Sequence, residues 1–181
     1  MILSQPGTSE QLIDNRDEPE VPDGYVEMDQ ERPSPNHICQ DNGDGTGGWI
    51  LDLDGIKSRA VIEVDHQAEQ ARQQRVTPGN YQPAEYERAR QQAEAYVAGE
   101  ITDSAALQAD VDAGTIDPRT GSPVADQAEA ADLVLYMRDQ WFAALDQIRT
   151  ERLAAKRDIE QAADEAGVQA VLDGLAWPNT S

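Results

Sequence analysis

One long amphipathic pattern dominates the hydrophobic and polar positions of this chain. From about residue 124 to residue 166 the sequence contains neither proline nor glycine. Apolar residues recur there at spacings of three or four, with one skip at Arg152, and this is the stripe of an amphipathic helix: Val134, Met137, Trp141, Leu145, Ile148, Ala155, Ile159 and Ala162. Such a helix would be about 60 Å long, whereas a compact domain of this length has a radius of gyration of about 16 Å. We therefore expect the helix to break, to protrude or to pack against another chain.

Shorter helical patterns lie on either side of the long one. We predict helices over residues 56–76 and 83–98, separated by the strong stop signal at residues 77–80 (TPGN). A third short helix should be capped by Thr102 or Asp103 and end at Ala113, before a loop over residues 115–123. Gly167 should end the long helix. A final short helix over 168–175 then leads to Trp177, which we expect to fold back as a hydrophobic latch.

The first part of the chain has a different pattern. Short alternating segments at residues 25–28, 37–39 and 49–51 predict a β hairpin or three-stranded flap, and the glycine-rich run 41–48 between the last two predicts a turn. Residues 1–23 are polar and acidic apart from an apolar start, and we expect an extended N-terminal arm.

These elements predict a mainly α protein, α+β overall. We expect a helical bundle with one long C-terminal helix and a small N-terminal β flap. The predicted organisation is an arm over 1–23, a β flap over 24–55 and a helical domain over 56–178, with the long helix at about 124–166.

The long helix carries a wide apolar face that suggests an interface. Tyr136 and Phe142 lie off the main stripe, so the apolar surface broadens there. It could pack on the first two helices of the same chain, or it could contact another subunit. The candidate partner interface consists of Tyr136, Met137, Trp141, Phe142, Leu145 and Ile148.

Charge narrows the classes of partner. The chain of 181 residues carries 35 acidic and 14 basic residues, for a net charge of −21. This sign opposes nucleic-acid binding, and the chain has no polybasic membrane patch. Only two of the basic residues are lysines, Lys57 and Lys156. Lysine depletion with excess acid is typical of proteins that work in high salt, although GC-rich codon usage produces the same composition.

Sequence signals for catalysis, metals and export are weak. Cys39 is the single cysteine, which excludes an intramolecular disulfide and fits a reducing cytoplasm, and residues 1–20 do not have the pattern of a signal peptide. No nucleotide-binding or zinc-protease motif occurs, the loop from Asp41 fits no calcium-binding frame, and His66 has no second ligand at metal spacing. We therefore predict no catalytic, cofactor-binding or metal-binding residues and a protein that is not an enzyme.

Several motifs resemble a family of small proteins from tailed bacteriophages. The run from Ala71 to Gly79 (ARQQRVTPG), followed by Tyr86 and by the segment 93–96 (AEAY), is similar to a helical segment common in those proteins. The family's long helix carries a tryptophan and then an "I-E-x-x-R" stretch, which Trp141 and residues 148–152 (IRTER) resemble. The segment 24–28 with residues 32–34 and Trp49 is similar to the N-terminal flap of tail-fibre-associated and tail-fibre-assembly proteins. Val76 and Arg90 depart from the family pattern, where an aromatic residue and a lysine are common.

The resemblance implies a non-enzymatic tail protein, made in the host cytoplasm and located in the virion tail. Such a protein binds tail-fibre or baseplate proteins by helical packing, as a homo- or hetero-oligomer, without nucleic acid or membrane. The alternative within this class is a tail-fibre assembly chaperone that is absent from the mature virion. An alternative of another class, suggested by the charge, is an acidic regulatory or DNA-mimicking protein.

Overall fold

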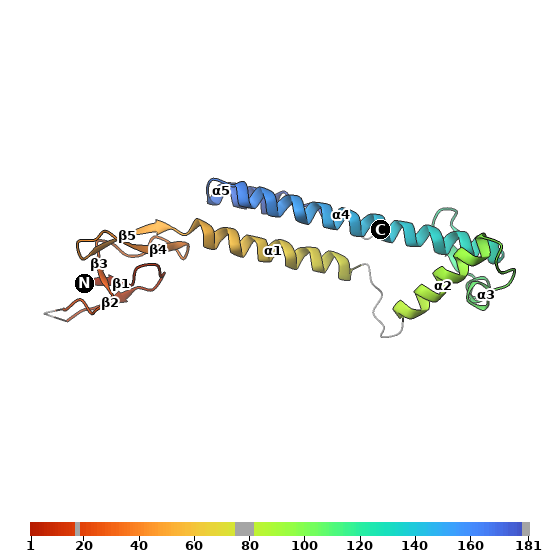
Figure 1. The fold of residues 1–181 in the computed structure, drawn as a ribbon, viewed down its shortest axis with the longest axis horizontal. Helices are drawn as coiled ribbons and strands as arrows, with labels where there is room; N and C mark the ends of the chain where they lie inside the picture. The colour runs from red at the N-terminus through yellow and green to blue at the C-terminus, as the bar shows by residue number, and fades with distance from the viewer. Residues whose placement is uncertain (17–18, 75–81, 179–181) are drawn as a thin grey trace. The chain divides into compact units, whose positions relative to one another are not determined.

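The computed structural model describes residues 1–16, 19–74 and 82–178 of the chain, with the side chains of residues 82 and 83 left undescribed. Its elements are β1 (Ile2–Ser4), β2 (Leu12–Ile13), β3 (Val26–Met28), β4 (His37–Asp41), β5 (Thr46–Leu51), α1 (Leu53–Gln73), α2 (Gln82–Val97), α3 (Ala105–Asp112), β6 (Ile116–Asp117), β7 (Ser122–Pro123), α4 (Gln127–Gln161) and α5 (Glu165–Asp173). Figure 1 shows them along the chain. The prediction of a mainly helical α+β protein with a small N-terminal sheet and a long C-terminal helix is confirmed.

The chain forms two compact units, and the division between them falls within α1 and α4. The first unit comprises Met1–Asp65 and Ala154–Leu175, and the second comprises His66–Leu153 and Ala176–Ser181. Each unit therefore combines two stretches that are separate in the sequence.

The sheet of the first unit has the strand order β2-β1-β3-β5-β4. The pair β4–β5 is an antiparallel hairpin, whereas β3 and β5 run parallel. All three predicted strand segments are confirmed. The predicted turn is confirmed in its central part, because Gly43 and Gly45 have φ values of 82° and 87°, a region that favours glycine.

The prediction of an extended arm over residues 1–23 was wrong for its first part. β1 lies inside the sheet between β2 and β3, with Leu3 opposite Glu27, and β2 forms the edge. Leu3 and Ser4 are fully buried. Three apolar residues give too short a pattern to indicate a strand, because what stabilises β1 is pairing with a segment more than twenty residues away.

The core of the sheet is small and tightly packed. Val26, Met28 and Cys39 are buried together, with Ile2 and Trp49 against them. Gly47 lies beneath these side chains, and a Cβ atom built there would be 2.6 Å from Val26 and 2.8 Å from Met28. The close approach of strand β5 to its neighbours thus requires glycine at this position.

The outer edge of β4 is covered by the chain that follows β1. The Gly7 N–H donates to the Cys39 carbonyl (2.8 Å), and the Cys39 N–H donates to the Thr8 carbonyl (2.8 Å). The loop therefore takes up the outward backbone groups of Cys39, which an edge strand would otherwise leave unpaired.

In the same unit, α1 packs on the end of α4 and on α5. Ala60 and Val64 of α1 are buried, as are Ile159 of α4 and Val168 of α5. Lys156 of α4 pairs with Asp65 of α1, with the ammonium nitrogen 2.7 Å from the carboxylate.

The end of the long helix differs from the prediction. α4 stops at Gln161, and Gly167 lies within α5 instead of ending α4. Asp164 is the N-cap of α5, because its carboxylate accepts the Gly167 N–H at 2.8 Å. This side-chain cap, and not a glycine, sets the break at residues 162–164. The expected range of 124–166 was thus too long at both ends.

In the second unit, α2, α3 and the start of α4 enclose a separate core. Its buried residues are alanines, leucines and a valine: Ala93, Leu107, Val124, Ala130, Ala131 and Leu133. The cap of α3 is Ser104, whose hydroxyl accepts the Leu107 N–H, so the predicted caps Thr102 and Asp103 were wrong. The predicted loop over 115–123 contains the two-stranded hairpin β6–β7, with Ile116 opposite Pro123. The predicted stop at residues 77–80 lies outside the described residues.

Candidate functional site

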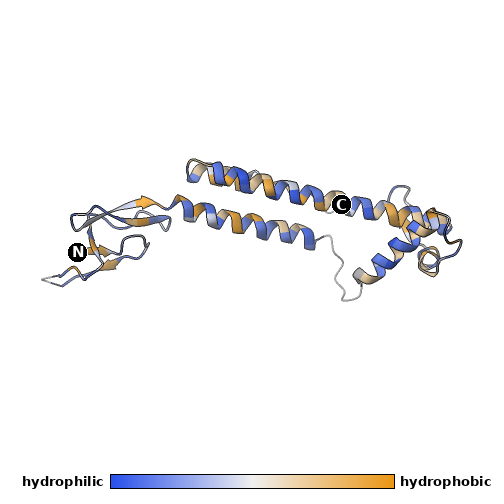
Figure 2. Cartoon of the chain, in the orientation of Figure 1, coloured by the Kyte–Doolittle hydropathy of each residue, from blue (hydrophilic) through white to orange (hydrophobic). Residues whose placement is uncertain are grey.

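The apolar stripe of α4 is continuous in sequence, but its burial changes along the helix. Ala144 and Ile148 are buried, at 7% and 0% exposure, and the preceding turns around Ala131 are buried as well. Between them, Met137 is 51% exposed and Trp141 is 39% exposed, although both lie on the same side of the helix as Ile148. Figure 2 shows hydrophobic positions recurring along the whole of α4.

Phe142 extends this uncovered stretch sideways. Its side chain is 50% exposed, and its ring lies against Trp141 with the ring centroids 5.1 Å apart and the planes tilted by 60°. Such a tilted arrangement is favourable between two aromatic rings. We call Met137, Trp141 and Phe142 the aromatic window of α4.

Ion pairs fix the rim of the aromatic window on one side. Arg138 of α4 contacts Glu94 of α2 at 2.7 Å and Asp139 at 2.7 Å, while the second oxygen of Glu94 contacts Arg90 at 2.7 Å. Because these charges neutralise one another, the rim adds little net charge to the window. The network also holds α2 against α4, which positions the apolar residues next to it.

The predicted interface residues separate into exposed and covered ones. Met137, Trp141 and Phe142 are exposed together, as described above. Ile148 is fully buried against Ala68 and Ala71 of α1, so it is not part of the exposed surface, and its place in a partner interface stays a prediction. Leu145 is half-buried.

Tyr136 serves the core of the second unit instead. It packs against the buried cluster of α2, α3 and α4, and the Arg119 guanidinium lies 4.7 Å from the centre of its ring. Arg119 itself is held by Asp117 and Asp132, each at 2.7 Å. Tyr136 therefore anchors the β6–β7 hairpin to α4 through a cation–π contact.

Leu153 was missed by the sequence reasoning. Its side chain is 46% exposed, and it lies eleven residues after Phe142, which is three helical turns along the same side. Counting a second stripe from Phe142, rather than only the main one, would have found it.

The tail after α5 adds a residue that the sequence did predict. Trp177 packs against the cluster of Ala68, Ala71 and Ile148, and its indole N–H donates to the Gln67 side-chain oxygen at 3.0 Å. The predicted hydrophobic latch is thereby confirmed.

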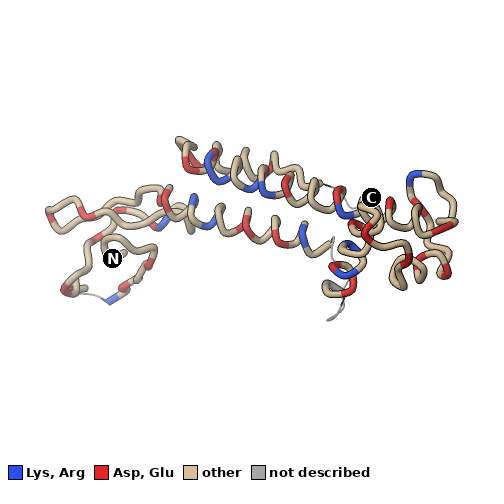
Figure 3. Tube along the Cα trace, turned by 45° about the vertical axis from the view of Figure 1, so that its right-hand side comes forward, with Lys and Arg blue, Asp and Glu red and all other residues tan. Residues whose placement is uncertain are grey.

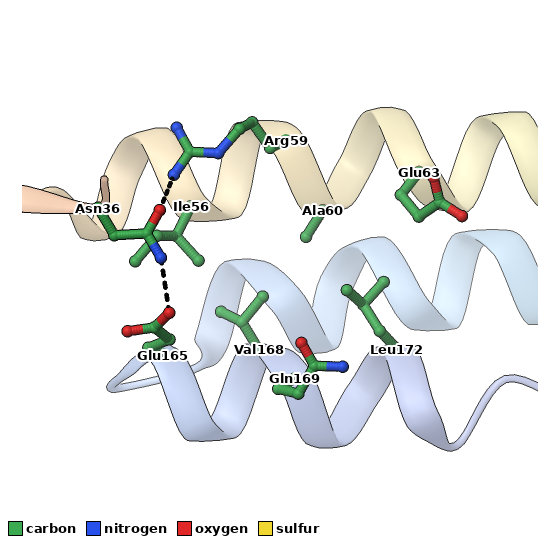
Figure 4. A pocket seen from close by; sticks show the side chains of 9 residues that line it. All are labelled: Asn36, Ile56, Arg59, Ala60, Glu63, Glu165, Val168, Gln169 and Leu172. Carbon is green, nitrogen blue, oxygen red and sulfur yellow. Dashed lines mark hydrogen bonds between the residues drawn. The ribbon is translucent and has the colours of Figure 1, made fainter. Parts of the chain in front are cut away.

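A shallow groove of about 340 Å³ lies in the first unit (Figure 4). Ile56 and Ala60 of α1 face Val168 and Leu172 of α5 across it. At its end, the Arg59 guanidinium donates to the Asn36 side-chain oxygen (2.7 Å).

The Asn36 amide nitrogen donates in turn to the Glu165 carboxylate (2.6 Å). These polar groups bind one another, so we assign them the role of holding α5 against α1 and β4. The aromatic window remains the stronger candidate.

Acidic residues occur on every part of the trace in Figure 3, whereas basic residues lie mainly on the helices. Up to Asp52 the only arginines are Arg16 and Arg32, and there is no lysine. The N-terminal sheet region is therefore strongly acidic, and the long helix holds a larger share of the cations.

Further geometric observations concern metals and membranes. Within residues 1–16, 19–74 and 82–178, no group of three or more His, Cys, Asp or Glu side chains is arranged to hold a metal ion. None of the helices in the described part of the chain has both the length and the apolar character needed to cross a bilayer.

Comparison with protein-family models, with curated proteins and with solved structures gives no match for this chain. The aromatic window therefore has to be interpreted from its own geometry.

Proposed function

We propose that this chain is a non-enzymatic component of a bacteriophage tail, which binds tail-fibre or baseplate proteins by helical packing against α4. In this proposal the helices of the chain and the partner form a bundle around the aromatic window, and the protein is part of the virion tail. The observation that carries the proposal is the exposure of Met137 and Trp141 on a stripe that the chain itself covers before and after them along α4, with Phe142 exposed beside it.

The size of the aromatic window defines the kind of contact that it can make. Half-exposed side chains of this size present roughly 100 Å² each, so the window offers roughly 300 Å². A standard interface buries about 800 Å² on each partner. The window thus has the area of an energetic hot spot, and surrounding residues such as Leu153 complete the contact.

The phage context comes from the resemblance of the segments around Tyr86, residues 93–96 and Trp141 to small tail proteins. This context implies that the partner is a structural protein bound in an assembly and not the substrate of an enzyme. An interface whose exposed groups are apolar agrees with that implication. Binding through such a surface needs no charged partner, and the neutralised rim around Arg138 fits this requirement.

Co-purification tests the proposal. The tagged chain is expressed with the tail-fibre and baseplate proteins of the phage that encodes it, and recovery of each is measured by quantitative mass spectrometry. We expect a double Trp141→Ser, Phe142→Ser variant to lose at least tenfold of the recovered partner. Ile62→Ser is the matched control, because Ile62 is 68% exposed in the first unit. Equal recovery with both variants, or no tail protein with the unmodified chain, would refute the proposal.

Mass spectrometry of purified virions then distinguishes a virion subunit from an assembly chaperone. A stoichiometric copy number in finished particles supports the subunit, and absence from them supports a tail-fibre assembly chaperone. Recovery of a DNA-binding host protein instead would favour an acidic, DNA-mimicking role.

A further inference from the structure

The segment after α5 packs where α1 and α4 meet, at Ala68, Ala71 and Ile148, which we call the α1–α4 seam. This contact shows what kind of side chain the seam accepts. Trp177 lies in the irregular segment after α5, outside any helix. It covers Ile148, which is fully buried, together with the small side chains of Ala68 and Ala71. A large aromatic ring thus fills a site floored by two alanines and one isoleucine. We call these three residues and Gln67 the tryptophan seat.

Two hydrogen bonds join the tail to the tryptophan seat and to α4 beside it. The Trp177 indole N–H donates to the Gln67 side-chain oxygen at 3.0 Å, and the Ala176 backbone N–H donates to the Glu151 carboxylate at 3.3 Å. Trp177 itself remains only half-buried. A short irregular segment with a half-buried anchor belongs to the part of a protein that opens locally at lower free-energy cost than the helices do.

The tryptophan seat adjoins the aromatic window on the same stripe of α4. Ile148 follows Trp141 by seven residues, which is two helical turns on the same side of the helix. If the tail leaves, the exposed apolar stripe extends from Met137 through Trp141 to Ile148. That longer stripe includes Ile148, the interface residue that the free chain covers.

We propose that the tryptophan seat is a docking site for a short peptide segment of a partner protein, anchored by one aromatic side chain, and that the chain's own tail occupies the seat in the free protein. The occupant's chemistry follows from the resident segment: a flat apolar ring to cover Ala68 and Ala71, and a ring N–H or O–H to reach the Gln67 oxygen. The partner segment replaces Trp177 and continues along α4 onto the aromatic window. This inference deepens the proposed function and rests on it for the partner's place in a phage tail.

A peptide in trans tests the docking site without any tail protein. The full-length chain carrying Trp177→Ala has an open seat, and the probe is a fluorescein-labelled peptide with the sequence of residues 173–181. A matched peptide with alanine in place of its tryptophan is the control. We expect fluorescence anisotropy to show saturable binding of the tryptophan peptide to the Trp177→Ala chain. Binding should be at least tenfold tighter than binding to the native chain, whose seat is filled, and the alanine peptide should not bind.

Equal binding of the peptide to the native and Trp177→Ala chains, or no binding at millimolar peptide, would overturn the proposal. Collapse of the Trp177→Ala helical signal in circular dichroism would also overturn it, because Trp177 would then be a core residue and not a replaceable occupant. A second variant, Gln67→Leu, keeps both the fold and Trp177 but removes the acceptor. Combined with Trp177→Ala, this change should make the tryptophan peptide bind more weakly than it binds to the Trp177→Ala chain, because the peptide's ring N–H loses the same acceptor. Equal binding to the two chains would count against the assigned hydrogen bond.

The two proposals fail in different ways. Loss of peptide binding with intact co-purification of tail proteins would remove the docking site but leave the aromatic window as the interface. Peptide binding without recovery of any tail protein would retain the docking site and remove the phage-tail assignment.

Discussion

Trp141 and Phe142 are neighbours in α4 whose rings lie 5.1 Å apart, and both remain substantially exposed. Because consecutive residues on a helix point about 100° apart, the pair spreads aromatic surface over a wide angle instead of directing it into one core. We expect Phe142→Ser to change the free energy of unfolding by no more than about 0.5 kcal/mol. The same variant should bind less of the apolar dye ANS when folded. Destabilisation of several kcal/mol in urea titration would show that Phe142 is covered in solution.

Ile148 and Met137 provide a paired test of where the stripe is covered. Ile148→Ala should destabilise the protein by about 2–5 kcal/mol, because it removes a fully buried side chain from the α1–α4 seam. Met137→Ala should cost about 0.5 kcal/mol or less, since half of that side chain is already in water. Urea unfolding followed by circular dichroism measures both. Similar losses for the two variants would contradict the boundary between the seam and the aromatic window.

Gly47 and Gly48 give a similar comparison within the sheet. Gly47→Ala should cost about 1–3 kcal/mol, because the new methyl group would lie too close to Val26 and Met28 and would force them apart. Gly48→Ala is the control, since a Cβ atom there meets nothing within 4 Å. Thermal unfolding compares the two variants. If they melt at the same temperature, the packing of β5 against β3 is looser than described.

The N-cap of α3 predicts that stability is lost when one hydroxyl group, that of Ser104, is removed. Ser104→Ala should reduce stability by about 1 kcal/mol, because the Leu107 N–H would lose its buried acceptor. Thr102→Ala should have little effect, since Thr102 is exposed and does not cap the helix. Chemical denaturation of both variants decides between the observed cap and the one that the sequence suggested.

Asp117 makes stability depend on pH in the acidic range. Hydrogen bonds from the Arg119 side chain hold the pKa of the Asp117 carboxyl below its ordinary value. A carboxyl whose pKa is lower in the folded state stabilises the protein above the unfolded pKa, and this contribution is lost as pH falls through the folded pKa. The pKa of Glu87 is likewise lowered, to about 2, by hydrogen bonds from Arg90 and Gln91. Stability should therefore decline below about pH 4.

Unfolding followed from pH 6 down to pH 2 measures this decline. In an Asp117→Asn variant, stability near neutral pH should be lower and the decline at acidic pH shallower. An unchanged pH profile in that variant would show that the Asp117–Arg119 pair does not contribute.

The helices could be predicted because the spacing of their apolar residues is a local pattern of the sequence. The residues at which the helices begin and end could be predicted less well. α1, α2 and the body of α4 follow local periodicity, but the ends at Ser104 and Asp164 depend on which side chain reaches back to a backbone N–H. β1 could not be predicted, because its only apolar signal is three residues long and its partner strand lies beyond residue 25.

At the candidate site, the sequence identified the stripe but could not show which parts the chain covers itself. That distinction depends on where α1 ends at Gln73 and where the tail places Trp177. Both are set by tertiary packing, which the spacing of apolar residues within α4 does not encode. The aromatic window and the buried Ile148 therefore looked equivalent in sequence.

The cover that Gly7 and Thr8 place over Cys39 limits how copies of this protein could aggregate. Fibril growth by sheet extension needs an unpaired edge strand on both sides of each subunit's sheet, because every added copy must offer an edge to the next one. In this sheet the margin at β4 is covered at its centre, because the outward backbone groups of Cys39 are already hydrogen-bonded, and the other margin is the two-residue strand β2. Pairing of copies through this sheet is therefore expected at β2 rather than at the centre of β4, and the two-residue length of β2 limits the number of hydrogen bonds that such a contact can form.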